Sequence, residues 1–123
     1  MHIIHDPAAP AAPEISFGDF LKVDIRAGTI RSCSPFPAAR KPSFILTIDF
    51  GPAIGLRKSA AQVTDRYTPD DLVGRQIMAV VNFPARQIGP VMSEVLILGC
   101  ADESGAVLLA GADAKVPDGA RLA

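Results

Sequence analysis

The stretch TPDDLVGRQIMAVV, residues 68–81, decides the fold that the sequence predicts. Thr68 is a favoured helix N-cap, Pro69 suits the first helical position, and the two acidic residues that follow suit the positive end of a helix. Gly74 is a stop signal, so the helix is short. The apolar run after it has the composition of a strand. The chain therefore places one short helix directly before a strand.

Alternation of apolar and polar residues predicts the first two strands of the chain, and the composition of four further runs predicts the others. They are LKVDIRAGTIRSC (21–33), SFILTIDFG (43–51), RKSAAQVT (57–64), RQIMAVVNF (75–83), SEVLILGCA (93–101) and AVLLA (106–110). Gly28 predicts a bulge or bend that curls the first strand. Ser16 and Asp19 predict one capped helical turn before that strand. VPDGARL (116–122) predicts a turn with a short extended end.

Five or more strands with one short helix between the third and the fourth is the element order of an oligonucleotide-binding (OB) fold. No predicted helix is long enough to connect parallel strands, which excludes βαβ units. The sequence therefore predicts an all-β protein: a five-stranded OB Greek-key barrel with one short helix and extra terminal strands.

The length of 123 residues suits one domain, and the hydrophobic fraction of 49% suits a globular one. Residues 1–13 are rich in Ala and Pro and carry both histidines, His2 and His5, so they predict a flexible arm before a folded domain at 14–123. No apolar run approaches the roughly 20 residues of a membrane span. The N-terminus lacks the basic start of a secretory signal. We expect a cytoplasmic protein that does not insert into membranes.

The net charge of −1 hides an uneven distribution. Residues 22–58 hold seven basic and two acidic residues, which gives 7 − 2 = +5, so the remainder sums to −6. A basic half predicts a face for polyanions or acidic partners, with an ordinary solvated surface as the alternative. The basic residues are Lys22, Arg26, Arg31, Arg40, Lys41, Arg57 and Lys58.

The sequence argues against an enzyme. Both histidines lie in the arm, so the predicted domain has no imidazole to act as a base or to pair with a thiol or hydroxyl. Neither a GxxxxGKS/T loop nor a GxGxxG turn occurs. Cys33 and Cys100 lack metal-ligand spacing and are expected to be small apolar residues of a reduced protein, although a disulfide between them stays open. We expect no catalytic residue, metal or cofactor.

Several motifs resemble one known family. KVDIRAGTI (22–30) looks like the opening strand of the tRNA-binding domains appended to some methionyl- and phenylalanyl-tRNA synthetases. Four further stretches resemble a bacterial subgroup, the CsaA proteins: FPAARKPSFILTIDFG (36–51), IGLRKSAAQVT (54–64), GRQIMAVVNFPARQIGPVMSEVLILG (74–99) and VPDGARL (116–122). The resemblance implies a homodimeric OB barrel. It also implies an export-related chaperone that holds precursor polypeptides unfolded and engages the secretion motor, or a module that binds tRNA.

The chain departs from the family pattern at a few positions. Synthetase-type domains carry Ser-x-Gly-Met where this chain has Ser93-Glu94-Val95-Leu96, which removes a glycine and adds a negative charge near any bound phosphate. Within the CsaA pattern, alanine replaces an acidic residue, a serine and a proline at Ala38, Ala60 and Ala85. Arg40, Lys41, Lys58, Gln62, Asn82, Arg86, Gln87 and Ser93 follow the pattern.

Two functions and two sets of site residues follow. A polypeptide binder would use amide and guanidinium groups against peptide backbone and an apolar floor, and the expected residues are Asn82, Phe83, Arg86, Gln87 and Ser93. An RNA binder would neutralise phosphates, and the expected residues are Arg26, Arg40, Lys41, Arg57, Lys58, Asn82, Arg86 and Ser93. A third possibility is that Asn82 and Gln87 only satisfy backbone groups at a bend.

Phe36 is either an exposed aromatic contact or, more in keeping with a lone Phe, a plug at the barrel end.

Overall fold

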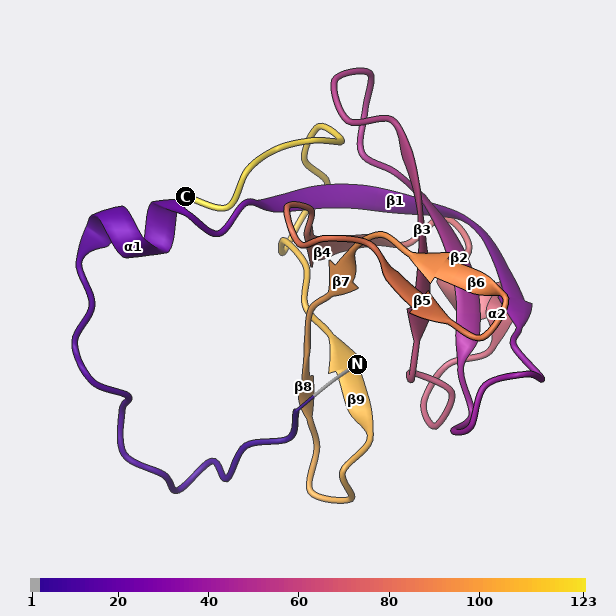
Figure 1. The fold of residues 1–123 in the computed structure, drawn as a ribbon, viewed down its shortest axis with the longest axis horizontal. Helices are drawn as coiled ribbons and strands as arrows, with labels where there is room; N and C mark the ends of the chain where they lie inside the picture. The colour runs from indigo at the N-terminus through magenta and orange to yellow at the C-terminus, as the bar shows by residue number, and fades with distance from the viewer. Residues whose placement is uncertain (1–2) are drawn as a thin grey trace.

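The computed structural model describes residues 3–123, so His2 in the predicted arm lies outside the described residues. Five antiparallel strands form the barrel, in the order β3-β2-β1-β4-β7 (Figure 1). Their bounds are β1 (Ile25–Pro35), β2 (Phe44–Asp49), β3 (Leu56–Ala61), β4 (Gln76–Val80) and β7 (Leu96–Ile97). The predicted all-β OB barrel is confirmed.

The helix that decided the fold is present as α2 (Pro69–Leu72), between β3 and β4. Its capping box is complete: Asp71 N–H donates to Thr68 Oγ1, and Thr68 N–H donates to Asp71 Oδ2 at 2.9 Å. The hydrogen bond from the Thr68 backbone is the main cause that lowers the pKa of Asp71. Leu72 is fully buried, and α2 packs against β1. The cap signals therefore place the helix where the sequence predicts it.

The core fills the barrel with alternating side chains from each strand. Leu46 and Ile48 point inward from β2, while Ile77 and Ala79 point inward from β4. Phe50 follows β2 and is completely buried. The period of two predicted for β2 is therefore confirmed by its burial, and β4 has a similar pattern.

Gly28 has a different role from the predicted one. The register of β1 against β2 shifts between Ile30 and Ser32, whereas Gly28 pairs regularly with Ile77. A Cβ on Gly28 would lie 2.7 Å from side-chain atoms of both Ile48 and Phe50. The bulge prediction at Gly28 was wrong, because this glycine makes room for core side chains and the irregularity falls later in the strand.

The predicted strand 93–101 is divided. Leu98 separates β7 from β8 (Gly99–Ala101), and β8 pairs with β9 (Val107–Leu109) in a hairpin outside the barrel sheet. Asp102 holds the turn by accepting from Ser104 and from Ala106 N–H. These hydrogen bonds, that of the Ser104 side chain first, lower the pKa of Asp102 to about 2. The returning strand predicted at 106–110 is confirmed as β9.

The C-terminal segment runs along the first half of β1. Gly119 N–H donates to Ala27 O, and Ala27 N–H donates to Ala120 O, each at 2.8 Å. The Asp118 side chain also holds this segment in place, because its carboxylate accepts hydrogen bonds from Thr29 Oγ1 at 2.6 Å and from Gln76 Nε2 at 3.1 Å. This cover explains why β1 is buried on both faces over Ala27–Ile30 rather than half-buried as predicted.

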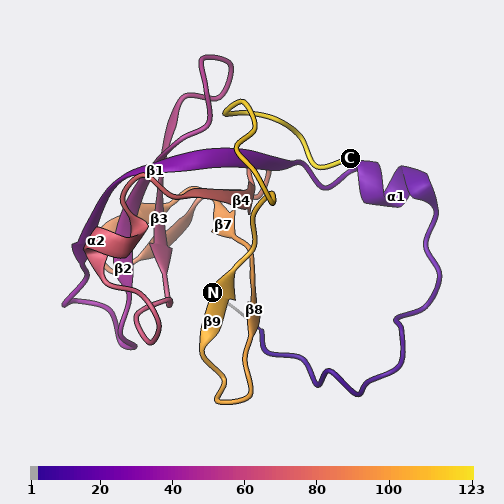
Figure 2. The same cartoon turned by 180° about the vertical axis from the view of Figure 1, so that it is seen from behind.

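The N-terminal part stands apart from the barrel. α1 (Phe17–Leu21) has the predicted capping box between Ser16 and Asp19 and buries none of its side chains. Before it, the arm curves from the β8–β9 side of the barrel round to α1, as both views show (Figures 1 and 2). No helix within residues 3–123 is both long and apolar enough to cross a membrane.

Candidate ligand-binding site beside the β5–β6 hairpin

A small hairpin projects between β4 and β7. It consists of β5 (Arg86–Ile88) and β6 (Val91–Ser93), joined by Gly89 and Pro90. Gly89 has a φ of +56°, which the two-residue turn requires. No strand was predicted for residues 84–92; the pair Gly89-Pro90 between the apolar residues Ile88 and Val91 was the signal that could have identified the turn.

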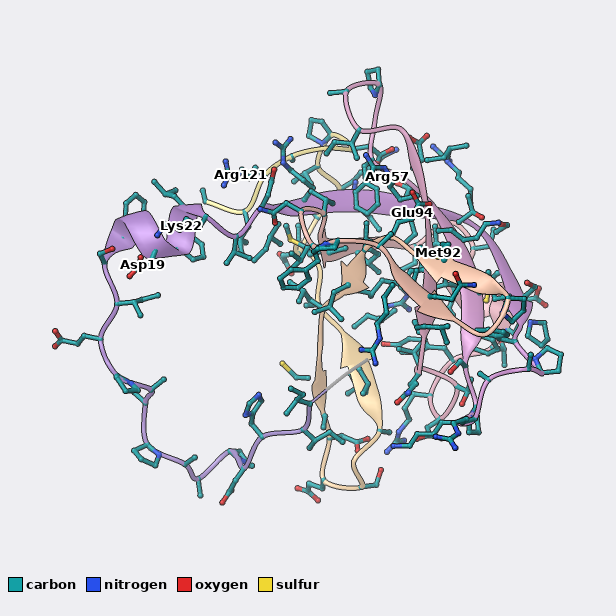
Figure 3. All side chains as sticks on the ribbon, in the orientation of Figure 1. Asp19, Lys22, Arg57, Met92, Glu94 and Arg121 are labelled. Carbon is teal, nitrogen blue, oxygen red and sulfur yellow. The ribbon has the colours of Figure 1, made fainter. Side chains whose placement is uncertain are left out.

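Side chains fasten the hairpin to β3 where the barrel closes. Ser93 Oγ accepts from Ala60 N–H at 3.1 Å, and Glu94 Oε1 accepts from Lys58 N–H at 3.0 Å. Glu94 N–H donates to Lys58 O at 2.8 Å, and the buried Ser59 hydroxyl donates to Val95 O at 3.1 Å. The Glu94 carboxylate therefore binds the edge of β3. Figure 3 shows Glu94 with Arg57 and Met92 on this side of the barrel.

A basic cleft lies on one side of the hairpin. It has a volume of about 460 Å³ and lies between the β1–β2 loop, the end of β3 and β5. Arg40 and Lys41 come from the loop, and neither forms a salt bridge within residues 3–123. The lining residues are Ala38, Ala39, Arg40, Lys41, Ser43, Ala60, Gln62, Arg86, Gln87, Ile88 and Gly89. The cleft therefore joins cations with amides, a set suited to phosphate or carboxylate groups.

An apolar groove lies on the other side of the hairpin. It has a volume of about 410 Å³, and its lining is mostly aliphatic and aromatic. Phe83 is 52% exposed there although it is a large apolar side chain. The lining residues are Ile3, Phe83, Pro84, Arg86, Ile88, Ser93, Glu94, Val95 and Leu96. Apolar walls with a few polar groups are typical of ligand pockets.

Arg86 connects the two hollows, because it lines both the basic cleft and the apolar groove. It lies on β5, which pairs with β6 on one side and has no strand partner on the other in the described sheets. An unpaired strand edge offers backbone N–H and C=O groups to an extended peptide. Guanidinium, strand edge and apolar floor are therefore close together.

The structure separates the predicted site residues into groups. Arg40, Lys41, Arg86 and Gln87 meet in the basic cleft, and Phe83, Arg86 and Ser93 meet in the apolar groove. Ser93 is also tied to Ala60, as described above. The side-chain amide of Gln87 donates to Gly89 O at 2.7 Å within the hairpin.

Four predicted residues line neither hollow: Arg26, Arg57, Lys58 and Asn82. Asn82 bridges two backbone groups, since Oδ1 accepts from Asp24 N–H at 2.9 Å and Nδ2 donates to Lys22 O at 2.8 Å. This is the backbone-satisfying role that the sequence left open. Arg26 is ion-paired with Asp24 at 2.6 Å beside the C-terminal segment. Arg57 Nε donates to Ile54 O at 3.4 Å.

Phe36 is a buried aromatic residue beside the hairpin turn. It is 5% exposed, and its Cζ lies 3.7 Å from the position that a Cβ on Gly89 would take. Phe36 is therefore buried rather than exposed, and it lies at the hairpin turn, outside the main core cluster. Cys33 and Cys100 are free thiols, and partial burial raises the pKa of Cys33. Within residues 3–123 no three His, Cys, Asp or Glu side chains gather closely enough to hold a metal ion.

Comparison with protein-family models and with curated proteins identifies relatives of this chain. Residues 25–121 match the family described as "Putative tRNA binding domain". A methionine–tRNA ligase from Porphyromonas gingivalis is 35% identical over 94% of this chain, and the chain spans 16% of that ligase's length. The chain therefore corresponds to a small part of the ligase.

Two solved structures match over the whole of their own chains. The chaperone CsaA from Bacillus anthracis is 43% identical, with a TM-score of 0.84 over 90% of this chain and 100% of that one. The CsaA chaperone protein from Picrophilus torridus is 44% identical, with a TM-score of 0.83 over 89% and 100%. The chain therefore belongs to the tRNA-binding domain family, in the group that contains the CsaA proteins.

Proposed function

We propose that the chain is a non-catalytic, CsaA-like chaperone of the cytoplasm that binds unfolded or precursor polypeptides in protein export. The observation that carries the proposal is the apolar groove, where the half-exposed Phe83 lies beside the open edge strand β5. Similarity to two CsaA chaperones over their full chains supports it. No cofactor enters the proposal.

The groove fits an extended polypeptide. Apolar client side chains would rest on Phe83, Pro84 and Leu96, while the client backbone pairs with the edge of β5. The Arg86 guanidinium would donate to client carbonyl groups. Contacts of this kind recognise peptide backbone and general apolarity, so they suit clients of many sequences.

A homodimer is part of the proposal. The α1 end of the molecule carries exposed apolar side chains: Ile15 is 70%, Phe17 72%, Leu21 49% and Leu122 42% exposed. Arg121 Nη2 donates to Leu21 O at 2.6 Å, so the C-terminal segment and α1 share this surface (Figure 3). Burying such a surface against a second copy would remove it from water.

The secretion motor is proposed as a further partner from the resemblance alone.

Truncating the site should weaken client binding. We expect both Phe83→Ala and the double variant Arg86→Ala/Gln87→Ala to bind a reduced, carboxymethylated polypeptide about tenfold more weakly, because removing a central contact costs about 1–2 kcal/mol. Fluorescence anisotropy measures the affinity, and light scattering of an aggregating client measures protection. Leu56→Ala is the matched control, since Leu56 is 61% exposed and lines neither hollow. Wild-type affinity in both site variants would exclude this site.

The basic cleft favours a second function, tRNA or structured-RNA binding, which the family match also supports. The loops on either side of the cleft are those that bind oligonucleotides in OB folds. Arg40, Lys41 and Arg86 would face phosphates there. This function is the alternative to the chaperone proposal.

Salt dependence tests the alternative. If tRNA lies in the cleft, we expect Arg40→Ala/Lys41→Ala to weaken tRNA binding and to reduce the salt slope of log K by about 2, because each lost phosphate contact removes nearly one unit. Arg57→Ala/Lys58→Ala is the matched pair, since it has the same chemistry outside the cleft. Titrations of bulk tRNA at two salt concentrations measure the slope. Equal losses in both pairs, or affinity that does not change with salt, would rule out the cleft as an RNA site.

A further inference from the structure

The arm returns to the apolar groove at its first described residues. Ile3 lines the groove together with Phe83 and Leu96. Ile3 and Ile4 also line a second hollow of about 840 Å³ beside β8 and β9. A Cβ on Gly105, in the β8–β9 turn, would lie 4.0 Å from Ile4 Cδ1. Ile3 therefore lies in the groove that an extended client would use, and Ile4 lies beside it against the β8–β9 turn.

The composition of the arm singles out this pair. Ile3 and Ile4 are the only large aliphatic residues of the described arm before Ile15, and the residues between are mainly Ala and Pro. Prolines hold a segment extended and lower the entropy that it loses on docking. Asp6 turns the chain directly after the pair, since it accepts from Ala8 N–H at 2.9 Å through Oδ1 and from Ala9 N–H at 3.0 Å through its carbonyl.

The contact is shallow. Ile3 keeps 74% and Ile4 keeps 59% of its surface exposed, so their docking buries little apolar area. A tether nevertheless gives the pair a local concentration of about millimolar order at the groove. A weak but tethered contact is occupied for part of the time, and a longer client segment can displace it.

We propose that Ile3, held in place by Ile4 in the neighbouring hollow beside β8 and β9, is a built-in occupant of the apolar groove, which competes with clients and shows which residues the groove accepts: extended segments that present β-branched aliphatic side chains. This inference rests on the proposed polypeptide binding.

Replacing the two isoleucines should strengthen client binding. We expect Ile3→Ser/Ile4→Ser to bind a fluorescent, permanently unfolded peptide rich in Ile and Val about two- to fivefold more tightly than wild type, because a competitor at its own local concentration is removed. The matched control is Ala8→Ser/Ala9→Ser, which makes the same kind of change in the exposed part of the arm. The control should bind as wild type does.

Further measurements in the same titration distinguish this inference from a failure of the proposed function. In a Phe83→Ala background the gain should disappear, because the groove is the shared site. Equal affinity of wild type and Ile3→Ser/Ile4→Ser, with the Phe83→Ala loss intact, would overturn the inference and leave the proposed function standing. No client binding by any variant would overturn both. A gain that grows with protein concentration would assign the occupant to a second copy and so refute a built-in one.

Discussion

Phe50→Ala should lower the free energy of unfolding by about 3–5 kcal/mol, the usual cost of removing a fully buried phenylalanine. Phe50 has no exposed surface, and its ring occupies the space beside Gly28 in β1 that a side chain would otherwise fill. Its loss would leave a cavity between β1 and the end of β2 that neighbouring side chains fill only in part. Urea denaturation followed by circular dichroism measures the change.

The control is Phe83→Ala, the same chemical change at a position that is 52% exposed. We expect it to alter the unfolding free energy by less than about 1 kcal/mol, since surface substitutions usually have small effects. A comparable loss in both variants would show that Phe50 does not have the central place in the core that the structure gives it.

Gly119→Ala should lower the free energy of unfolding by about 2–5 kcal/mol, from two sources. Gly119 has a φ of +90°, where a residue with a Cβ is strained by about 1–2 kcal/mol. The added Cβ would also lie 2.6 Å from Phe50 O, a backbone atom that cannot turn aside, and overpacking costs about 1–3 kcal/mol. The substitution would detach the C-terminal segment from β1.

Gly55→Ala separates these two sources. Gly55 has a φ of +79°, and no neighbouring atom lies within 4 Å of its added Cβ. This variant therefore has the backbone strain without the clash, and we expect about half of the Gly119→Ala loss or less. Chemical denaturation of both variants under one condition gives the comparison. Equal losses would mean that the approach to Phe50 O relaxes at no cost.

Local signals made much of the fold predictable. The caps at Ser16 and Thr68 involve residues three positions apart, so both helices follow from their own sequence. Alternation in β2 and β4 follows from the period of a half-buried strand. The element order then predicted the barrel. The sequence assigned Arg40 and Lys41 to RNA, Gln87 to a peptide and Arg86 to both, and the structure brings all four into one cleft.

The unpredicted features depend on contacts between distant residues. Gly28 is a glycine because Phe50, far along the chain, needs its space. Asn82 is an amide because it bridges the backbone of Lys22 and Asp24, which lie 60 and 58 residues earlier in the chain. Ser93, at the end of β6, and Glu94, directly after it, are polar because their side chains bind the backbone of β3. No local pattern distinguishes such residues from ligand contacts.

Arg86 stands at the boundary of the basic cleft and the apolar groove. A guanidinium that forms two parallel hydrogen bonds to one phosphate has fewer donors for a peptide carbonyl on the other side of the hairpin. If the chain bound both RNA and an unfolded client, the two ligands would therefore compete for Arg86. The share of molecules able to protect an unfolded chain would fall as the surrounding RNA concentration rises.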